Sequence, residues 1–326
     1  MPRLSQAVTP ALTIPQPPSV HIAPMATFSK ATFNTAQYAS IRPTYPRQLY
    51  DFIFRYHGQG QKARLDTAVD LGCGTGQATT ELTSFKKIIG VDPSAKMIEQ
   101  ATLNASKLGL PGQIEYKQSS AEELPFLQDS SVDLVSAAQA AHWFDWTKLW
   151  KEAARVLRPD GSLAVWGYSE FRLSRFPSAT KLINEYAQGS DPLTSLGPHW
   201  ERPGRTIVDE HLVAIPDPNE VVPDAFRDFE RVYFTGDHHP SLPHTRPVIL
   251  RKKMSWDDLM SYLRTFSSLH TFQEKHPDDR LNPDGDIAER FLNRLKEDVA
   301  RQDGKAGEDV DVEWPLALIL ARRRAE

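Results

Sequence analysis

From about residue 65 onward, short apolar runs alternate with stretches in which apolar residues recur at helical spacing. The short runs are rich in β-branched residues, which favour strands, whereas a spacing of three and four residues favours amphipathic helices. This alternation is typical of a parallel sheet flanked by helices. The predicted strands are 65–71, 88–91, 114–118, 132–137 and 162–168.

Three helices are predicted between these strands. A short helix is expected over 77–85. The second has its apolar stripe over 97–108 and is followed by Gly109, which stands where a C-terminal glycine cap belongs. The third begins after Asp145, because an aspartate side chain can accept the unpaired N–H groups of a first helical turn.

Beyond residue 169 the pattern becomes irregular and rich in proline. A capping box from Ser255 to Asp258 predicts the start of a helix. The three arginines 322–324 that follow the last apolar run are expected to be a solvated end of the chain. The elements predicted here are helices 179–188, 255–269 and 287–301 and strands 229–234 and 312–321.

Composition excludes several classes of protein. The chain has 326 residues with 38 basic and 42 acidic side chains, so its net charge of -4 gives no general attraction to nucleic acid. The longest apolar run, 314–321, is far shorter than the ~20 residues that a membrane-spanning helix needs. The one cysteine, Cys73, cannot form an intrachain disulfide. We therefore expect a cytoplasmic protein with neither a membrane nor a nucleic-acid partner.

The first 26 residues differ from the rest because they are rich in proline and contain no acid. We expect residues 1–26 to be a disordered leader and 27–326 to form the folded domain. A mitochondrial presequence also lacks acids but is rich in arginine, and Arg3 is the only arginine before Arg42. Met25 is an alternative start of translation, and its use is expected to leave the fold unchanged.

The most informative segment is Val-Asp-Leu-Gly-Cys-Gly-Thr-Gly at 69–76, where three alternate glycines leave a predicted strand. Glycine permits positive φ and lets the backbone approach a ligand closely. The third glycine comes one position too early for a dinucleotide fingerprint. Asp92 ends the next predicted strand, where a carboxylate can accept both hydroxyls of a ribose. Together, loop and acid predict a nucleoside site; the alternative is a structural turn with Asp92 as a helix cap.

The glycine loop resembles motif I of the class I S-adenosylmethionine-dependent methyltransferases. The similarity extends through Asp92, through Ala-Glu-Glu-Leu-Pro-Phe at 121–126 and through Leu-Arg-Pro-Asp-Gly at 157–161, and it covers about residues 33–169. Within this superfamily, the segments 38–46 and 139–145, and more loosely 262–267, resemble the fungal trans-aconitate methyltransferase-like group.

The resemblance implies an α/β fold: a Rossmann-like, seven-stranded, mostly parallel sheet flanked by helices, with an N-terminal lid. The cofactor-binding core would be 65–169, and 170–326 would hold a substrate-side insertion and the C-terminal strands. The implied cofactor is S-adenosyl-L-methionine. Asp70 would receive its amino group and Asp92 its ribose. Ser120 stands where related enzymes often have an acid, so adenine contact would come from Ala121 or Glu122. The implied cofactor-binding residues are Asp70, Gly72, Cys73, Gly74, Gly76, Asp92, Ala121 and Glu122.

The methyl acceptor has to be aligned with the cofactor and shielded from water. A carboxylate acceptor is already ionised at neutral pH and needs cationic clamps, whereas a phenol, hydroxyl or amine can need a base. His142, at the end of the fourth predicted strand, is the catalytic candidate: it either orients the acceptor or removes a proton, and the alternative is a purely structural histidine. The candidate substrate-binding residues are Arg42 and Tyr45 of the lid, Trp143, and Tyr262 and Arg264 of the predicted roof helix.

Each of these substrate candidates also has an ordinary explanation, core packing for the aromatics and surface or capping roles for Arg42 and Tyr45. His238, His239 and His244 lie close in sequence, but no suitable carboxylate or cysteine spacing accompanies them, so no metal site is assigned. The leading hypothesis is methyl transfer to a small molecule, a carboxylate or other oxygen nucleophile, by a monomer or homodimer. The alternatives are an N- or C-methyltransferase of secondary metabolism, a nicotinamide-dependent oxidoreductase and a non-catalytic cofactor-binding protein.

Overall fold

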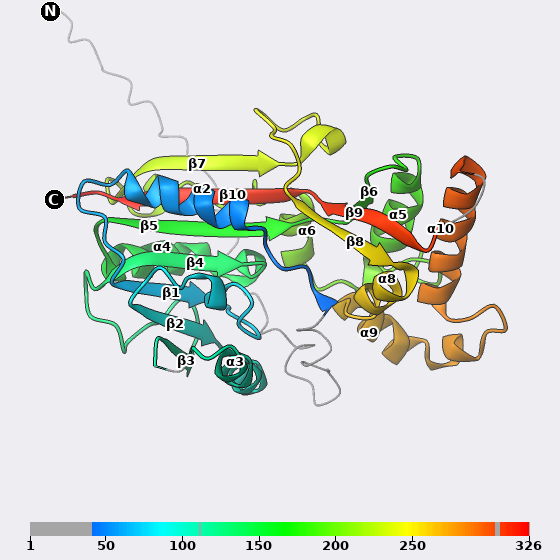
Figure 1. Cartoon of the computed structure of the whole chain (residues 1–326), viewed down its shortest axis with the longest axis horizontal. Helices are drawn as coiled ribbons and strands as arrows, with labels where there is room; N and C mark the ends of the chain where they lie inside the picture. Colours follow the sequence, from blue (N-terminus) through cyan, green and yellow to red (C-terminus); the bar gives the residue numbers. More distant parts are fainter. Residues whose placement is uncertain (1–40, 111, 304–306, 326) are drawn as a thin grey trace, which may run out of the picture.

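The computed structural model describes residues 41–110, 112–303 and 307–325 (Figure 1). The predicted leader 1–26 and the lid before residue 41 lie outside these residues. The helices are α2 (Arg47–Gly58), α3 (Ala95–Lys107), α4 (Trp146–Val156), α5 (Ala179–Gln188), α6 (Gly204–Asp209), α7 (Pro218–Val221), α8 (Trp256–Leu263), α9 (Ser267–Lys275) and α10 (Ile287–Asp303). The strands are β1 (Thr67–Leu71), β2 (Lys87–Asp92), β3 (Ile114–Gln118), β4 (Val132–Ala138), β5 (Leu157–Tyr168), β6 (Arg172–Leu173), β7 (Phe226–Phe234), β8 (Leu250–Ser255), β9 (Asp309–Trp314) and β10 (Leu316–Arg323).

A seven-stranded sheet in the order β3-β2-β1-β4-β5-β10-β7 forms the centre of the fold. The pairs among β1 to β5 are parallel, and β10 runs antiparallel to both β5 and β7. The predicted Rossmann-like, mostly parallel sheet is therefore confirmed. Because parallel strands end at the same edge, Asp70 of β1 lies opposite both Gly90 of β2 and Ser136 of β4. This edge carries the site described below.

The two faces of the sheet are covered by different helices. Alternate residues of a strand point to opposite faces. Leu316, Leu318 and Leu320 of β10 accordingly join one buried cluster with side chains of α2, whereas Ala317 and Ile319 join a second with side chains of α4. Figure 1 shows α2 lying along β5 and β10 on one face of the sheet. Both faces are thus closed to water, as the near-continuous apolar strands require.

The predicted helix at 77–85 was wrong, because only a 3₁₀ turn, η1 (Thr79–Glu81), forms there. Gly76, with φ +88°, turns the chain just before it. The Thr79 side chain donates to Asp70 at 2.6 Å, and that of Thr80 donates to the carbonyl of Gln77. Threonine hydroxyls that bond locally compete with regular helix formation. The other two helices form where they were expected: α4 begins after its Asp145 cap, and α3 ends just before Gly109, which has φ +70°.

Two other predicted elements each divide into two. Helix 255–269 keeps its capping box at Ser255 but ends after Leu263, and α9 begins at Ser267. Strand 312–321 is interrupted by Pro315, which has no N–H for a sheet ladder. The residues after it pair in the central sheet as β10, whereas those before it form β9 in a second, antiparallel sheet of order β6-β9-β8.

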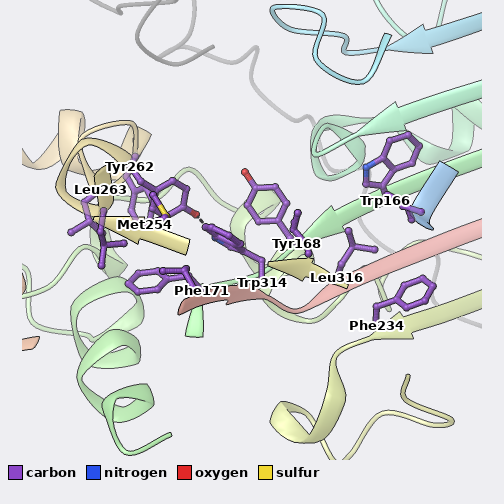
Figure 2. Close-up of a cluster of buried hydrophobic side chains, with 14 of the residues drawn as sticks. Trp166, Tyr168, Phe171, Phe234, Met254, Tyr262, Leu263, Trp314 and Leu316 are labelled. Atoms are coloured by element: carbon purple, nitrogen blue, oxygen red, sulfur yellow. Dashed lines mark hydrogen bonds between the residues drawn. The ribbon is translucent and has the colours of Figure 1, made fainter. Parts of the chain in front are cut away.

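The second sheet and the helices α5, α8, α9 and α10 form a cap beyond the end of β5 (Figure 1). Figure 2 shows the buried aromatic side chains where the cap meets the central sheet. Trp314 donates its indole N–H to the Tyr262 hydroxyl at 3.0 Å, and its ring packs 6.3 Å from that of Tyr168. One continuous core therefore fixes the cap on the sheet.

The first of the terminal arginines, expected to be solvated, is buried. Arg322 is 1% exposed because β10 lies between β5 and β7, and α2 covers its end. Its guanidinium donates to the carbonyls of Tyr56 and His57 and pairs with Asp228 at 3.3 Å. The apolar run of β10 thus ends at a buried arginine, Arg322, whose hydrogen bonds hold the last turn of α2. Within the described residues no helix has the length and apolarity to cross a bilayer.

Candidate active site

A cavity opens at the edge of the central sheet where β1, β2, β4 and β5 end. Its empty volume, with the solvent in its open mouth included, is about 1230 Å³. We call one side the loop end, formed by Gly72, Cys73, Gly74, Asp92 and Met97. We call the other the roof end, formed by Arg42, Tyr45, His142, Trp143, Tyr168, Glu170, Trp200, Arg205 and Tyr262.

The glycine loop leaves β1 with three left-handed residues, Gly72, Gly74 and Gly76, at φ +62°, +53° and +88°. A Cβ added at Gly72 would lie 2.5 Å from the Cβ of Ala140, so no other residue fits there without movement. A Cβ at Gly74 would meet nothing within 4 Å. The backbone at Gly74 is therefore open to the cavity, whereas Gly72 lets the loop pack against the segment after β4.

Asp92 ends β2 and points at the glycine loop. One carboxylate oxygen accepts the Gly74 N–H at 3.0 Å, and the other accepts the Ser94 N–H at 2.9 Å. The residue is 2% exposed and lines the cavity, and burial raises the pKa of its carboxyl. Loop and carboxylate thus converge on one cavity. Each carboxylate oxygen has a second lone pair, so Asp92 can hold the loop and still accept ligand hydroxyls.

Asp70 does not line the cavity. It is fully buried, and its two oxygens accept the hydroxyls of Thr79 at 2.6 Å and Ser136 at 2.8 Å. Burial raises the pKa of this carboxyl to about 6, although the two hydroxyls oppose the shift. Asp70 thereby ties the glycine loop to β4. Its contact with a ligand amino group stays a prediction.

The two residues expected near the adenine also lie away from the cavity lining. Ala121 is 6% exposed within a core cluster. The Glu122 carboxylate accepts the Asp145 N–H at 2.9 Å, next to the start of α4. Met97 of α3 lines the loop end instead. A contact of Ala121 or Glu122 with a base also remains a prediction.

His142 lies in the 3₁₀ turn η2 (Ala141–Trp143) after β4, and it lines the cavity beside Trp143. Its ring centroid is 4.8 Å from that of Trp143. Burial, followed by the charge of Arg205, lowers the pKa of His142 to about 3. The imidazole is therefore neutral at physiological pH and a weak base. Between the two roles left open by the sequence, this favours orientation of a ligand over proton removal.

Arg42 connects the start of the described chain to the cap. Its guanidinium donates to the Tyr168 hydroxyl at 3.1 Å and to the Thr265 carbonyl at 3.2 Å. It also lies 5.3 Å from the ring centre of Tyr262. Tyr45 packs edge-on against Trp166 at 5.4 Å. Both predicted lid residues line the cavity together with Tyr262.

Arg264 is not brought to the cavity. Its guanidinium pairs with Asp286, just before α10, and with Glu289 at 3.2 Å. Arg264 follows the last residue of α8, so its side chain joins the end of that helix to α10. Tyr262 lies two positions earlier and faces the cavity. Residues two positions apart on a helix do not share a face, so Tyr262 and Arg264 point to different sides.

Sequence reasoning missed Glu170, Trp200 and Arg205, which all line the cavity. Glu170 follows the end of β5, and the rule that strand ends border the ligand crevice could have found it. Arg205 comes from α6 in the irregular region and gave no signal. Its guanidinium lies 4.1 Å from the ring centre of Trp200 and pairs with Glu170 and with Asp209.

The histidines of the segment 238–244 take no part in this cavity. His238 bonds to Glu313 at 2.6 Å, and His239 packs against His211 with ring centroids 3.9 Å apart and ring planes tilted by 58°. In the described part of the chain, no three histidine, cysteine or acidic side chains are grouped so that they could hold a metal ion.

Comparison with known proteins gives consistent matches. The family described as "Methyltransferase domain" matches residues 69–165. A Dictyostelium discoideum protein named "Putative methyltransferase" is 30% identical over 289 residues, which cover 88% of this chain and 92% of that protein. A Saccharomyces cerevisiae protein named "Probable S-adenosylmethionine-dependent methyltransferase CRG1" is 27% identical over 92% of this chain and 99% of its own length.

A solved structure from Anaeromyxobacter dehalogenans, described as "a Putative Type II Methyltransferase", is similar over 87% of this chain and 99% of its own. The two share 25% sequence identity and superpose with a TM-score of 0.61. The matches to this structure and to the two relatives extend well beyond the glycine loop, so the similarity includes the cap as well as the cofactor-binding core.

Proposed function

The chain belongs to the class I S-adenosylmethionine-dependent methyltransferases, and we propose that its acceptor is a small organic acid or another oxygen nucleophile. The observation that carries this proposal is the continuity of one cavity from the glycine loop and Asp92 to the arginines and His142 of the roof end. A cofactor at the loop end and an acceptor at the roof end would share that cavity.

The loop end fits S-adenosylmethionine. Gly74 leaves the backbone open where a Cβ would otherwise stand, and Asp92 supplies acceptors for ribose hydroxyls beside it. When bound, the cofactor supplies a methyl group made electrophilic by its sulfonium. We assign Gly72, Cys73, Gly74 and Asp92 to holding it, whereas Gly76 does not line the cavity and lies against Tyr116. Asp70 supports the loop from behind through Thr79 and Ser136.

The roof end favours an acceptor that is already anionic. The guanidiniums of Arg42 and Arg205 can donate forked hydrogen bonds to a carboxylate. A carboxylate needs no general base at neutral pH, which agrees with the low pKa of His142. The neutral imidazole would then orient the acceptor. The walls of Trp143, Tyr168 and Tyr262 would exclude water from it.

Two narrower proposals rest on the sequence. The segments 38–46 and 139–145 support membership of the fungal trans-aconitate methyltransferase-like group, which leaves the acceptor itself open. The single cysteine supports a cytoplasmic enzyme, for which we propose a monomer or homodimer.

The decisive experiment supplies methyl-labelled S-adenosylmethionine with panels of carboxylic acids, phenols and amines and identifies each product by mass. We expect label in an acid or another oxygen-bearing acceptor, and methyl esters will release it on mild alkaline hydrolysis. Label confined to nitrogen or carbon would favour the N- or C-methyltransferase alternative. Cofactor binding without transfer to any compound would favour the non-catalytic alternative. The Asp92→Ala variant is the control: methyl transfer that takes place in the cavity should be reduced in it.

A further inference from the structure

Glu170 stands apart from the other acids of the cavity. It is 3% exposed, lies two residues after the end of β5 and lines the cavity. Its Oε1 pairs with Arg205. Its Oε2 is buried, and the described residues offer it no hydrogen-bond partner. A buried carboxylate oxygen without a donor is costly, so a site of this kind is completed by a ligand or by a bound water.

Arg205 is held in place independently of Glu170. Its guanidinium also pairs with Asp209 one helical turn further along α6, at 2.9 Å, and it lies over the ring of Trp200. Asp209 does not line the cavity. A fixed cation and a carboxylate with a vacant acceptor position are thus presented side by side at the roof end.

We propose that Glu170 and Arg205 together select the acceptor: Arg205 binds an anionic group, and Oε2 of Glu170 accepts a hydrogen bond from a hydroxyl or ammonium group next to it. This inference rests on the proposed function and narrows it. The acceptor class is then a hydroxy acid or an amino acid, not a plain carboxylic acid. Glu170 acts as a specificity-determining residue that touches the acceptor but takes no proton from it.

The test compares acids that differ in one substituent. Calorimetry measures the binding of succinate, malate and aspartate, of tricarballylate and citrate, and of benzoate and salicylate to the enzyme saturated with S-adenosylhomocysteine. In at least one series we expect the member with the added donor to bind at least about tenfold more tightly, the usual contribution of a hydrogen bond to a charged group. Which series shows this preference depends on which of the acids have a size that fits the cavity.

Glu170→Gln keeps the shape of the side chain and removes its charge. We expect it to reduce that preference by at least about fivefold while the affinity for S-adenosylhomocysteine is unchanged. Asp209→Asn is the matched control, since it removes the other acidic partner of Arg205 outside the cavity. It should leave the preference as it is in the unaltered protein. Equal effects of the two substitutions would mean that Glu170 only holds Arg205, and would overturn the inference.

The calorimetric binding of the acids distinguishes failure of the inference from failure of the proposed function. Binding of both members of every series with affinities within about threefold of each other contradicts the inference but leaves the acid class standing. An absence of binding by every acid contradicts both. If Glu170→Gln does not fold, the preference of the unaltered protein still decides the question.

Discussion

The two ends of the cavity are built in different ways. The loop end comes from one short stretch, in which β1, the glycine loop and β2 bring Gly74 and Asp92 within 3.0 Å of each other. The roof end brings together residues from the start of the described chain, from β5, from α6 and from α8. Binding of the cofactor therefore depends on local geometry, whereas the choice of acceptor depends on how the cap sits on the sheet.

The largest expected effect is on the loop end. Asp92→Ala removes the proposed ribose acceptors and also the partner of the Gly74 N–H. We expect the affinity for S-adenosylhomocysteine to fall about 100-fold, as for the loss of two hydrogen bonds to a charged group. Calorimetric titration measures it. Asp129→Asn, an exposed carboxylate on the surface, is the control and should bind as the unaltered protein does. An unchanged affinity in Asp92→Ala would contradict the assignment of the loop end.

A smaller effect is expected when the loop is altered through its backbone. Gly72→Ala places a Cβ against Ala140 at a residue with φ +62°. Displacement of the loop should weaken S-adenosylhomocysteine binding by about 2 kcal/mol, the order of strain at such a position. Gly58→Ala adds the same methyl group at the end of α2, where nothing lies within 4 Å. If the two variants bind equally well, the loop does not require its left-handed glycine.

The loop end of the cavity could be predicted from the sequence more completely than the roof end. The strands, the glycine loop and Asp92 were predictable because each depends on neighbours in the chain. The 3₁₀ turn after the loop was missed because the helical pattern does not show that Thr79 bonds to Asp70 of β1 and Thr80 to the Gln77 carbonyl. Pro315 was visible in the sequence, but its division of one strand between two sheets was not expected.

The roof end could be predicted only in part. Arg42 and Tyr45 were predicted because the resemblance places their segment over the cofactor, and His142 because it lies at the end of a predicted strand; all three line the cavity. Arg205 could not be found, since α6 lies in an irregular region and its place depends on packing of the cap. Arg264 was chosen from an expected helix that ends too early, and Asp286 and Glu289 hold its side chain elsewhere.

Next in size are two effects of pH on the free energy of unfolding, which have opposite signs. One comes from Asp70 in β1, behind the glycine loop, and the other from His142 at the roof end. Asp70 has a pKa near 6 in place of 3.8, so between pH 4 and 6 the folded protein holds its proton more firmly and Asp70's contribution to stability falls as pH rises. His142 has a pKa near 3 in the folded protein in place of 6.5, so the unfolded chain holds the imidazole proton more firmly. The contribution of His142 to stability therefore rises with pH. Each slope is at most about 1.4 kcal/mol per pH unit.

Two substitutions separate these slopes. Relative to the unaltered protein, Asp70→Asn should make the free energy of unfolding rise more steeply with pH, and His142→Asn should make it rise less steeply. Urea denaturation at several pH values between about 4.5 and 6 measures both. Changes of the same sign in the two variants would contradict the burial of one or other group.

The smallest expected effect distinguishes the roof end from its surroundings. Arg264→Gln breaks the ion pairs with Asp286 and Glu289. Because Arg264 is partly exposed and the buried Asp286 still accepts two backbone N–H groups, the free energy of unfolding should fall by only about 1 kcal/mol. Because Arg264 lies outside the cavity, the affinity for acceptor acids should stay the same. Arg42→Gln is the comparison, since its guanidinium lines the cavity and its loss should weaken acid binding. A loss of acid binding in Arg264→Gln but not in Arg42→Gln would mean that the acceptor binds near Arg264 and α10 and not at the roof end.

The division of the cavity is tested most directly by a crystal structure of the protein with S-adenosylhomocysteine bound. We expect the ribose hydroxyls within about 3 Å of the Asp92 carboxylate, the chain of the ligand along Gly72 and Gly74, and its sulfur turned towards His142 and Tyr168. A nucleoside bound among Arg42, Glu170 and Arg205, with Asp92 out of contact, would contradict it.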